Sequence, residues 1–218
     1  LKKNMVFGMT WGRAMHEFVE QLAKDERLRS LSFQNVKVVP FLGTPGAIQS
    51  DSWNTTTYSN TLATKVGNLL HCASYNLSAP MYVEGTKEKE LIESIDEIAK
   101  VLHMAETADI ALIGIGSMQD DSSIIKAEIR TREEYKELVR KGAVGEIVGR
   151  IYDKNGQTVD EDLKRKMVGI SLDKIAKIPV RVGMSYGKDK IEAIKGAIAG
   201  GLVNVLVTDV PTAELLLK

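Results

Sequence analysis

Two lysines at the start of a predicted helix are the first residues whose position indicates chemistry. Lys188 and Lys190 precede a helical pattern with apolar residues at Ile191, Ile194 and Ile198. The amino end of a helix carries partial positive charge, so cations are unfavourable there unless an anion binds to the lysine and the backbone amides. The spacing also fits two solvated surface lysines, and both interpretations stay open at this point.

Two loops that follow apolar runs could supply further groups to a ligand. Thr10-Trp11-Gly12-Arg13 offers a hydroxyl, a glycine and a guanidinium. Gly114-Ile115-Gly116-Ser117 would let a ligand approach the backbone closely, because glycine has no side chain. This second loop lacks the third glycine and the following helix of a dinucleotide-binding fingerprint, so we reject that motif.

An acidic residue, Glu146, completes a set of groups suited to a phosphorylated sugar. Cations and amides such as those at Arg13 and Lys190 suit a phosphate, and a carboxylate suits sugar hydroxyls. A sugar phosphate is therefore a reasonable ligand class from the residue types alone. Glu146 could equally be a surface carboxylate at the end of a helix or strand.

Several catalytic and metal-binding patterns are missing from the sequence. There is no P-loop and no Gly-x-Ser-x-Gly elbow, and Ser117 has no general base nearby in sequence. The three histidines are predicted to lie within helices, without partners at metal-ligand spacing. We therefore expect no metal and no cofactor. The histidines are His16, His71 and His103.

Strand and helix patterns alternate along the chain, and this alternation predicts the scaffold that positions the loops. It is typical of a mostly parallel sheet with helices on both faces, in which ligands bind at the carboxyl ends of the strands. Buried strands are expected at residues 4–8, 36–41, 109–113, 180–184 and 203–207. The loops expected to converge on one crevice are Thr10–Arg13, Gly43–Gly46, Gly114–Ser117 and Ser185–Lys190.

Two local patterns give more specific expectations. Thr86 is expected to cap one long helix whose buried stripe includes Leu91 and Ile95. Asn155-Gly156, after an apolar run, predicts a tight turn and a small antiparallel excursion around residues 147–170.

Composition and charge exclude some classes of function. The 218 residues are 44% hydrophobic and 27% charged, which is ordinary for a globular protein of one large or two small domains. Lysine plus arginine equals aspartate plus glutamate at 29 each, so no net field would recruit nucleic acid. The sequence has no membrane-spanning apolar run, no signal peptide and one cysteine, Cys72, which suits a reducing cytoplasm. We expect a cytoplasmic domain taken from a longer protein.

Three stretches, at residues 6–13, 142–147 and 179–209, form a specific combination. Together they resemble the effector-binding domain of the SorC family of bacterial sugar-responsive transcriptional regulators, and the resemblance extends over essentially the whole chain. It implies a three-layer Rossmann-like domain over residues 1–218, similar to sugar-phosphate isomerases and glucosamine-phosphate deaminases. A smaller antiparallel portion is expected within about 114–178.

The same resemblance implies roles for individual residues. It makes Lys190 a phosphate-contacting lysine and Glu146 an acidic residue that faces the sugar. Leu42 stands where some members carry a lysine or arginine, which weakens any claim for a bisphosphate or a covalently held ligand. The predicted effector-binding residues are Thr10, Gly12, Arg13, Gly43, Thr44, Asn60, Gly116, Ser117, Glu146 and Lys190.

The implied function is effector binding and oligomerisation within a transcriptional regulator. We expect a phosphorylated sugar as effector, a homodimer or homotetramer, no membrane contact, and operator DNA contact only through an N-terminal helix-turn-helix that this chain lacks. A sugar-phosphate isomerase or deaminase on the same fold is the alternative. We favour the regulator over the enzyme, because no histidine or second carboxylate obviously joins Glu146 in the loops as a partner acid. A plain dimerisation module with an unused pocket is the third interpretation.

Overall fold

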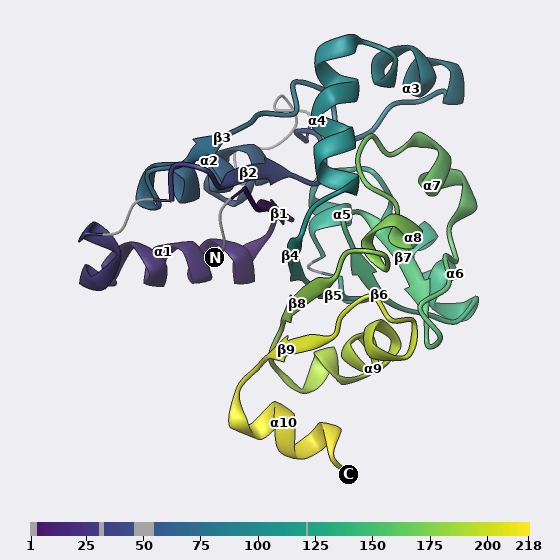
Figure 1. The fold of residues 1–218 in the computed structure, drawn as a ribbon. Coiled ribbons are helices and arrows are strands. Elements are labelled where there is room, and N and C mark those ends of the chain that lie inside the picture. Colours follow the sequence, from purple (N-terminus) through teal and green to yellow (C-terminus); the bar gives the residue numbers. More distant parts are fainter. Residues whose placement is uncertain (1–3, 31–32, 46–54, 121) are drawn as a thin grey trace.

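A parallel sheet of six strands runs through the computed structural model, which describes residues 4–30, 33–45, 55–120 and 122–218 (Figure 1). The strand order is β3-β2-β1-β4-β8-β9, and every neighbouring pair is parallel. The alternating pattern of the sequence therefore predicted the architecture correctly. The strands are β1 (Val6–Met9), β2 (Lys37–Pro40), β3 (Ala73–Ser74), β4 (Ile110–Gly114), β8 (Val180–Met184) and β9 (Val205–Val207).

The order of the strands reverses between β1 and β4. The chain proceeds outward from β1 to β2 and β3, then returns to place β4 on the other side of β1, with Met9 opposite Leu112. The loops that leave β1 and β4 therefore diverge at the carboxyl edge of the sheet. Such a switch point is where open α/β sheets form their ligand crevice.

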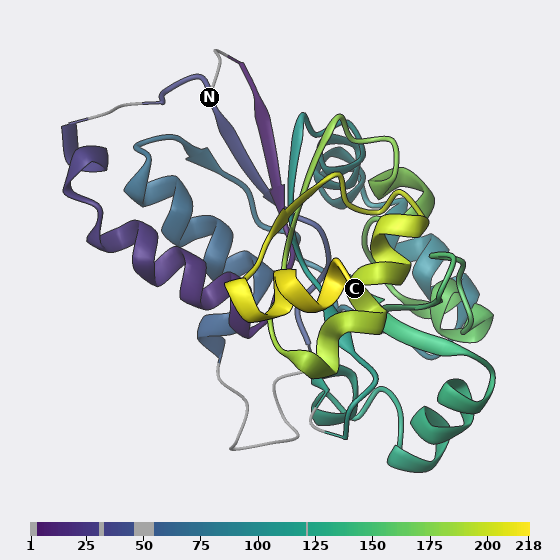
Figure 2. The ribbon, with the colours of Figure 1, turned by 90° about the horizontal axis from the view of Figure 1, so that it is seen from below.

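Helices cover the sheet from both sides. Met15 and Val19 of α1 (Arg13–Lys24) and Leu62 of α2 (Ser59–Leu69) pack on one face against Met9. Figure 2 shows these two helices side by side (purple and blue). The other face is covered by helices that include α4 (Asp96–Glu106), α8 (Leu172–Ile175) and α9 (Ile191–Ala199). The remaining helices are η1 (Glu26–Ser30), η2 (Thr55–Thr57), α3 (Thr86–Glu93), α5 (Ser123–Lys126), α6 (Arg132–Arg140), α7 (Glu161–Lys166), η3 (Lys188–Lys190) and α10 (Val210–Leu216).

A small antiparallel sheet joins β5 (Gly116–Ser117), β6 (Ala143–Ile147) and β7 (Arg150–Asp153). The expected turn at Asn155-Gly156 is present, because the amide of Gly156 donates to the carbonyl of Asp153 at 2.9 Å. The hairpin between β6 and β7 reverses earlier, at Val148-Gly149. Val148 and Gly149 have φ of 56° and 68°, as a type I′ turn requires, and valine seldom adopts such a backbone.

The long helix expected after Thr86 is divided into α3 and α4. Ser94 donates its hydroxyl to the carbonyl of Leu91 at 2.7 Å, and two acidic residues in the first turn of α4 favour a new helix start. Leu91 and Ile95 are 69% and 50% exposed, so their predicted place in the buried stripe was wrong.

The last strand and the last turn of α9 are more exposed than predicted. Val205 and Val207 of β9 are 45% and 52% exposed, because β9 lies at the edge of the sheet. Ile198, expected on the inner face of its helix, is 50% exposed. His71 lies in the turn after α2 with φ of 50°, and not within a helix. None of the described helices has the length and apolar character needed to cross a membrane.

Candidate functional site

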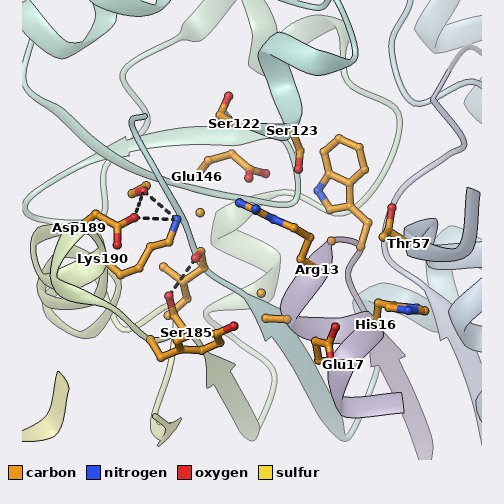
Figure 3. Close-up of a pocket in the computed structure, with 18 residues that line it drawn as sticks. Arg13, His16, Glu17, Thr57, Ser122, Ser123, Glu146, Ser185, Asp189 and Lys190 are labelled. Carbon is orange, nitrogen blue, oxygen red and sulfur yellow. Dashed lines mark hydrogen bonds and ion pairs between the residues drawn. The ribbon is translucent and has the colours of Figure 1, made fainter. Parts of the chain in front are cut away.

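A cavity of about 650 Å³ opens at the carboxyl ends of β1, β4 and β8 (Figure 3). It is lined by the start of α1, by the β4–β5 segment, by β6 and by the loop from β8 into η3. Three of the four loops expected to converge do so. The predicted site residues that line the cavity are Gly12, Arg13, Gly116, Ser117, Glu146 and Lys190.

The amino end of α1 forms one wall of the cavity. Gly12 precedes the helix with φ of 107° and ψ of 175°, a conformation that is essentially restricted to glycine. Within the described residues, no side chain caps this helix, and its first turn contains no acidic residue. The amides of the first turn and the helix dipole can therefore act on a ligand in the cavity, and both favour an anion.

Two cationic side chains face the same space from opposite walls. Figure 3 shows the Arg13 guanidinium and the Lys190 ammonium extending toward one another across the cavity. Lys190 donates from Nζ to the Ser117 hydroxyl oxygen at 2.8 Å, and its side chain is only 19% exposed. Two cationic side chains directed at one space suit a negatively charged ligand, although the Asp189 carboxylate already lies 3.3 Å from Nζ of Lys190.

Glu146 contributes a buried carboxyl group to the wall beside these cations. It is 7% exposed, and its carboxyl oxygens accept hydrogen bonds from the amide of Gly149 and from the Trp11 side chain. Glu146 lies opposite Gly116 in the small sheet, and a Cβ on Gly116 would come within 2.8 Å of its Oε2. A side chain at position 116 would therefore press on this carboxyl group, and glycine leaves room for it.

Burial changes the proton affinity of this carboxyl group. Removal from water raises the pKa of Glu146 from 4.5 to about 7, against the opposing effects of its hydrogen bonds and of the nearby Arg150 and Lys190 charges. Near neutral pH the group can donate a hydrogen bond when protonated or accept one when ionised. Either form suits a sugar hydroxyl.

A buried arginine anchors the turn that follows Glu146. Arg150 is 2% exposed and donates to the carbonyls of Val148, Met167 and Gly169 at 3.1–3.2 Å. Burial lowers the pKa of Arg150 to about 10. This role could not be predicted from the sequence, because the three acceptors come from segments that only the fold brings together.

The pKa of Glu146 leads to a prediction about pH and stability. A folded-state pKa above 4.5 gives a stabilising contribution that is complete below pH 4.5 and is lost as the pH rises to about 7. For a shift of this size the change is about 3 kcal/mol. We expect urea denaturation of Glu146→Gln between pH 5 and 8 to lack this decline. The control is Glu192→Gln, because Glu192 is an exposed carboxylate whose Oε1 lies 3.8 Å from Nζ of Lys195. An equal decline of stability in Glu146→Gln and in the wild type would contradict the prediction.

Four predicted site residues do not line the cavity and instead form contacts within the protein. Thr10 is fully buried, and its hydroxyl accepts from the amide of Gly114 at 2.9 Å, which joins β1 to β4. Asn60 donates to the Thr44 hydroxyl at 2.9 Å and exchanges two hydrogen bonds with the backbone of Leu77.

Gly43 packs directly on the neighbouring extended segment. A Cβ on this residue would lie 2.5 Å from the carbonyl oxygens of Ala79 and Pro80. Gly46, the last residue of that expected ligand loop, is outside the described residues.

Several lining residues were not predicted from the sequence. His16 and Glu17 follow Arg13 at helical spacing, so a helical projection of α1 could have found them. Ser122, Ser123 and Thr57 gave no such signal. Among the residues that the structure describes, no group of three or more histidine, cysteine, aspartate or glutamate side chains could hold a metal ion.

Comparison with known proteins decides the family. A family model described as "Putative sugar-binding domain" matches residues 1–218. The chain belongs to the sugar-binding domains of SorC-type transcriptional regulators. The resemblance found in the sequence is thereby confirmed.

Individual relatives of this sugar-binding domain are regulators and not enzymes. The sorbitol operon regulator of Klebsiella pneumoniae is 30% identical over 220 residues, which cover 100% of this chain and 66% of that protein. The transcriptional regulator LsrR of Escherichia coli is 35% identical over 159 residues, 71% of this chain and 50% of LsrR. The sugar-binding domain therefore spans about half to two thirds of these two relatives.

Solved structures confirm the predicted three-layer fold. The crystal structure of full-length SorC from Klebsiella pneumoniae matches with a TM-score of 0.88 and 30% identity, over 100% of this chain and 68% of that one. The probable sor operon regulator from Shigella flexneri matches with a TM-score of 0.86 and 28% identity, over 100% of this chain and 82% of that one.

Proposed function

We propose that this sugar-binding domain senses a phosphorylated sugar. The observation that carries the proposal is the convergence of Arg13, Lys190 and the uncapped start of α1 on one cavity. A phosphate group would accept hydrogen bonds from the guanidinium, the ammonium and the backbone amides together. In this arrangement the phosphate would lie between two positively charged side chains.

The rest of the cavity is suited to the sugar. Glu146 and the hydroxyls of Ser122 and Ser123 line the cavity and can exchange hydrogen bonds with sugar hydroxyls. The volume of about 650 Å³ lies within the range of small-molecule sites.

Effector binding would act on a regulator that contains this domain. We propose that the sugar phosphate favours one arrangement of the subunits of a homodimer or homotetramer, and so changes the operator affinity of a separate DNA-binding domain. The same proposal assigns the protein to the cytoplasm, where phosphorylated sugars are available. One relative, the sorbitol operon regulator, is named as the regulator of an operon.

A sugar-phosphate isomerase or deaminase is the alternative that one observation favours. A carboxyl group with a pKa of about 7, such as Glu146, suits a general base at neutral pH. The relatives described above are regulators, which favours the sensor.

A ligand screen separates these two functions. We expect a phosphorylated sugar, present at about 100 times its Kd, to stabilise the domain by about 2.7 kcal/mol and to raise its melting temperature. The neutral parent sugars are the matched controls, and the incubated ligands are examined by NMR for isomerisation or release of ammonia. Stabilisation without turnover supports the sensor. Turnover would favour the enzyme, and a panel without any stabilising sugar phosphate would contradict the proposal.

A further inference from the structure

Asp189 places a carboxylate beside the two groups expected to hold the phosphate. Its Oδ2 lies 3.3 Å from Nζ of Lys190 and accepts a hydrogen bond from the Ser117 hydroxyl at 3.2 Å. Lys190 and Ser117 are themselves hydrogen-bonded at 2.8 Å. The three side chains therefore form a closed triangle on the cavity wall (Figure 3).

The backbone before Asp189 is shaped to admit this carboxylate. Gly187 has φ of 107°, and a Cβ on it would come within 2.8 Å of Oδ1 of Asp189. The Gly187 amide donates to the Thr212 hydroxyl at 2.8 Å, which attaches the turn to α10. A side chain at position 187 would thus displace the carboxylate from the triangle.

The three members of the triangle differ in their freedom to move. The side chain of Asp189 is 48% exposed, whereas that of Lys190 is 19% exposed and Ser117 is 4% exposed. Rotation of the Asp189 side chain would carry its carboxylate into solvent and leave the ammonium and the hydroxyl in place. An anion could then accept hydrogen bonds from both.

We propose that Asp189 is an internal counter-ion, which in the empty site takes the position at Lys190 and Ser117 that the anionic group of the effector takes in the occupied site. This proposal deepens the proposed function and rests on it. Because the anion must displace the carboxylate, Asp189 lowers the affinity for every anionic effector. Asp189 thereby also raises the concentration of anionic effector at which the sensor responds. Because this effect depends on the charge of the ligand, Asp189 is a specificity-determining residue.

The charge of the ligand sets the size of this effect. Repulsion between the Asp189 carboxylate and a bound anion increases with the charge of that anion, and a neutral sugar experiences none. The residue should therefore act on phosphorylated sugars and inorganic phosphate, and should leave the binding of neutral sugars almost unchanged.

The test is calorimetric titration of the wild type, Asp189→Asn and Glu192→Gln with inorganic phosphate, a panel of sugar phosphates and the neutral parent sugars. Asparagine keeps the size of the side chain and an oxygen acceptor for Ser117 but removes the charge. Glu192→Gln removes the same charge from the next turn, at a residue paired with Lys195. We expect Asp189→Asn to bind phosphate and the sugar phosphates about three- to tenfold more tightly, the range for loss of a partly exposed ion pair and its repulsion. Glu192→Gln should change their affinity less than twofold.

Each outcome separates this proposal from the proposed function. Weaker binding by Asp189→Asn would mean that the carboxylate contacts the effector, and unchanged binding would mean that it does not compete. If the wild type still binds a sugar phosphate, either result overturns the counter-ion proposal and leaves the proposed function intact. If neither the wild type nor Asp189→Asn binds any sugar phosphate, the proposed function is wrong, and the counter-ion proposal that rests on it is wrong as well. A thermal unfolding curve of each variant establishes that it is folded.

Discussion

Replacement of Asp160 by alanine is expected to lower the free energy of unfolding by about 3–5 kcal/mol. Asp160 accepts from Nε and Nη2 of Arg130 at 2.8 and 3.1 Å, and the two side chains are 7% and 9% exposed. It also caps α7 by accepting from the amide of Leu163 at 2.9 Å. The variant therefore leaves a buried guanidinium without its main partner and removes a helix cap.

Asp162 provides the matched control for this experiment. It lies 3.0 Å from the same Arg130, but its side chain is 50% exposed, and ion pairs of that kind contribute at most about 1 kcal/mol. Urea denaturation of Asp160→Ala and Asp162→Ala measures the difference directly. Equal losses in the two variants would contradict the importance of the buried pair. This pair joins the start of α6 to α7, and the strands β6 and β7 of the small antiparallel sheet lie between these two helices in the sequence.

Replacement of Lys190 by alanine is expected to weaken binding of a phosphorylated sugar by about 1.5–3 kcal/mol, or roughly 10- to 150-fold. The variant removes a charged donor that already extends into the cavity and leaves Asp189 to repel the phosphate. Isothermal titration calorimetry with the sugar phosphate identified in the screen gives the change in Kd.

Lys188 is the control for the removal of charge in this second experiment. It lies in the same η3 turn, is exposed, and does not line the cavity. Lys188→Ala should change the affinity less than threefold. Unchanged affinity in Lys190→Ala would remove this lysine from the binding site.

Much of the fold was predictable because its parallel strands and amphipathic helices have strong periodic patterns. The spacing of Thr131 and Glu134 in the sequence is that of a capping box, which predicts a helix start there, and the structure contains both of its hydrogen bonds at the start of α6. The turn at Val148-Gly149 could not be predicted, since the backbone there adopts positive φ at a valine. The two-residue β3 is too short to have a pattern.

The site was predictable where a residue acts through its type and its place after a strand. Arg13, Lys190 and Glu146 were selected on that basis, and the structure brings them to one cavity, while their roles in binding stay a prediction. The pKa of Glu146 depends on burial in a sheet that pairs it with Gly116, which no local pattern reveals. Asp189 was missed because only the fold brings Ser117 to it.

The most direct test of the central claim is a calorimetric titration of the domain with one sugar in its phosphorylated and its neutral form. The sugar phosphate that stabilises the domain most in the screen is the appropriate ligand. If Arg13, Lys190 and the start of α1 bind the phosphate, the phosphorylated form should bind at least about 100-fold more tightly than the neutral form, an energy difference of about 2.7 kcal/mol. Equal affinity for the two forms would contradict the account.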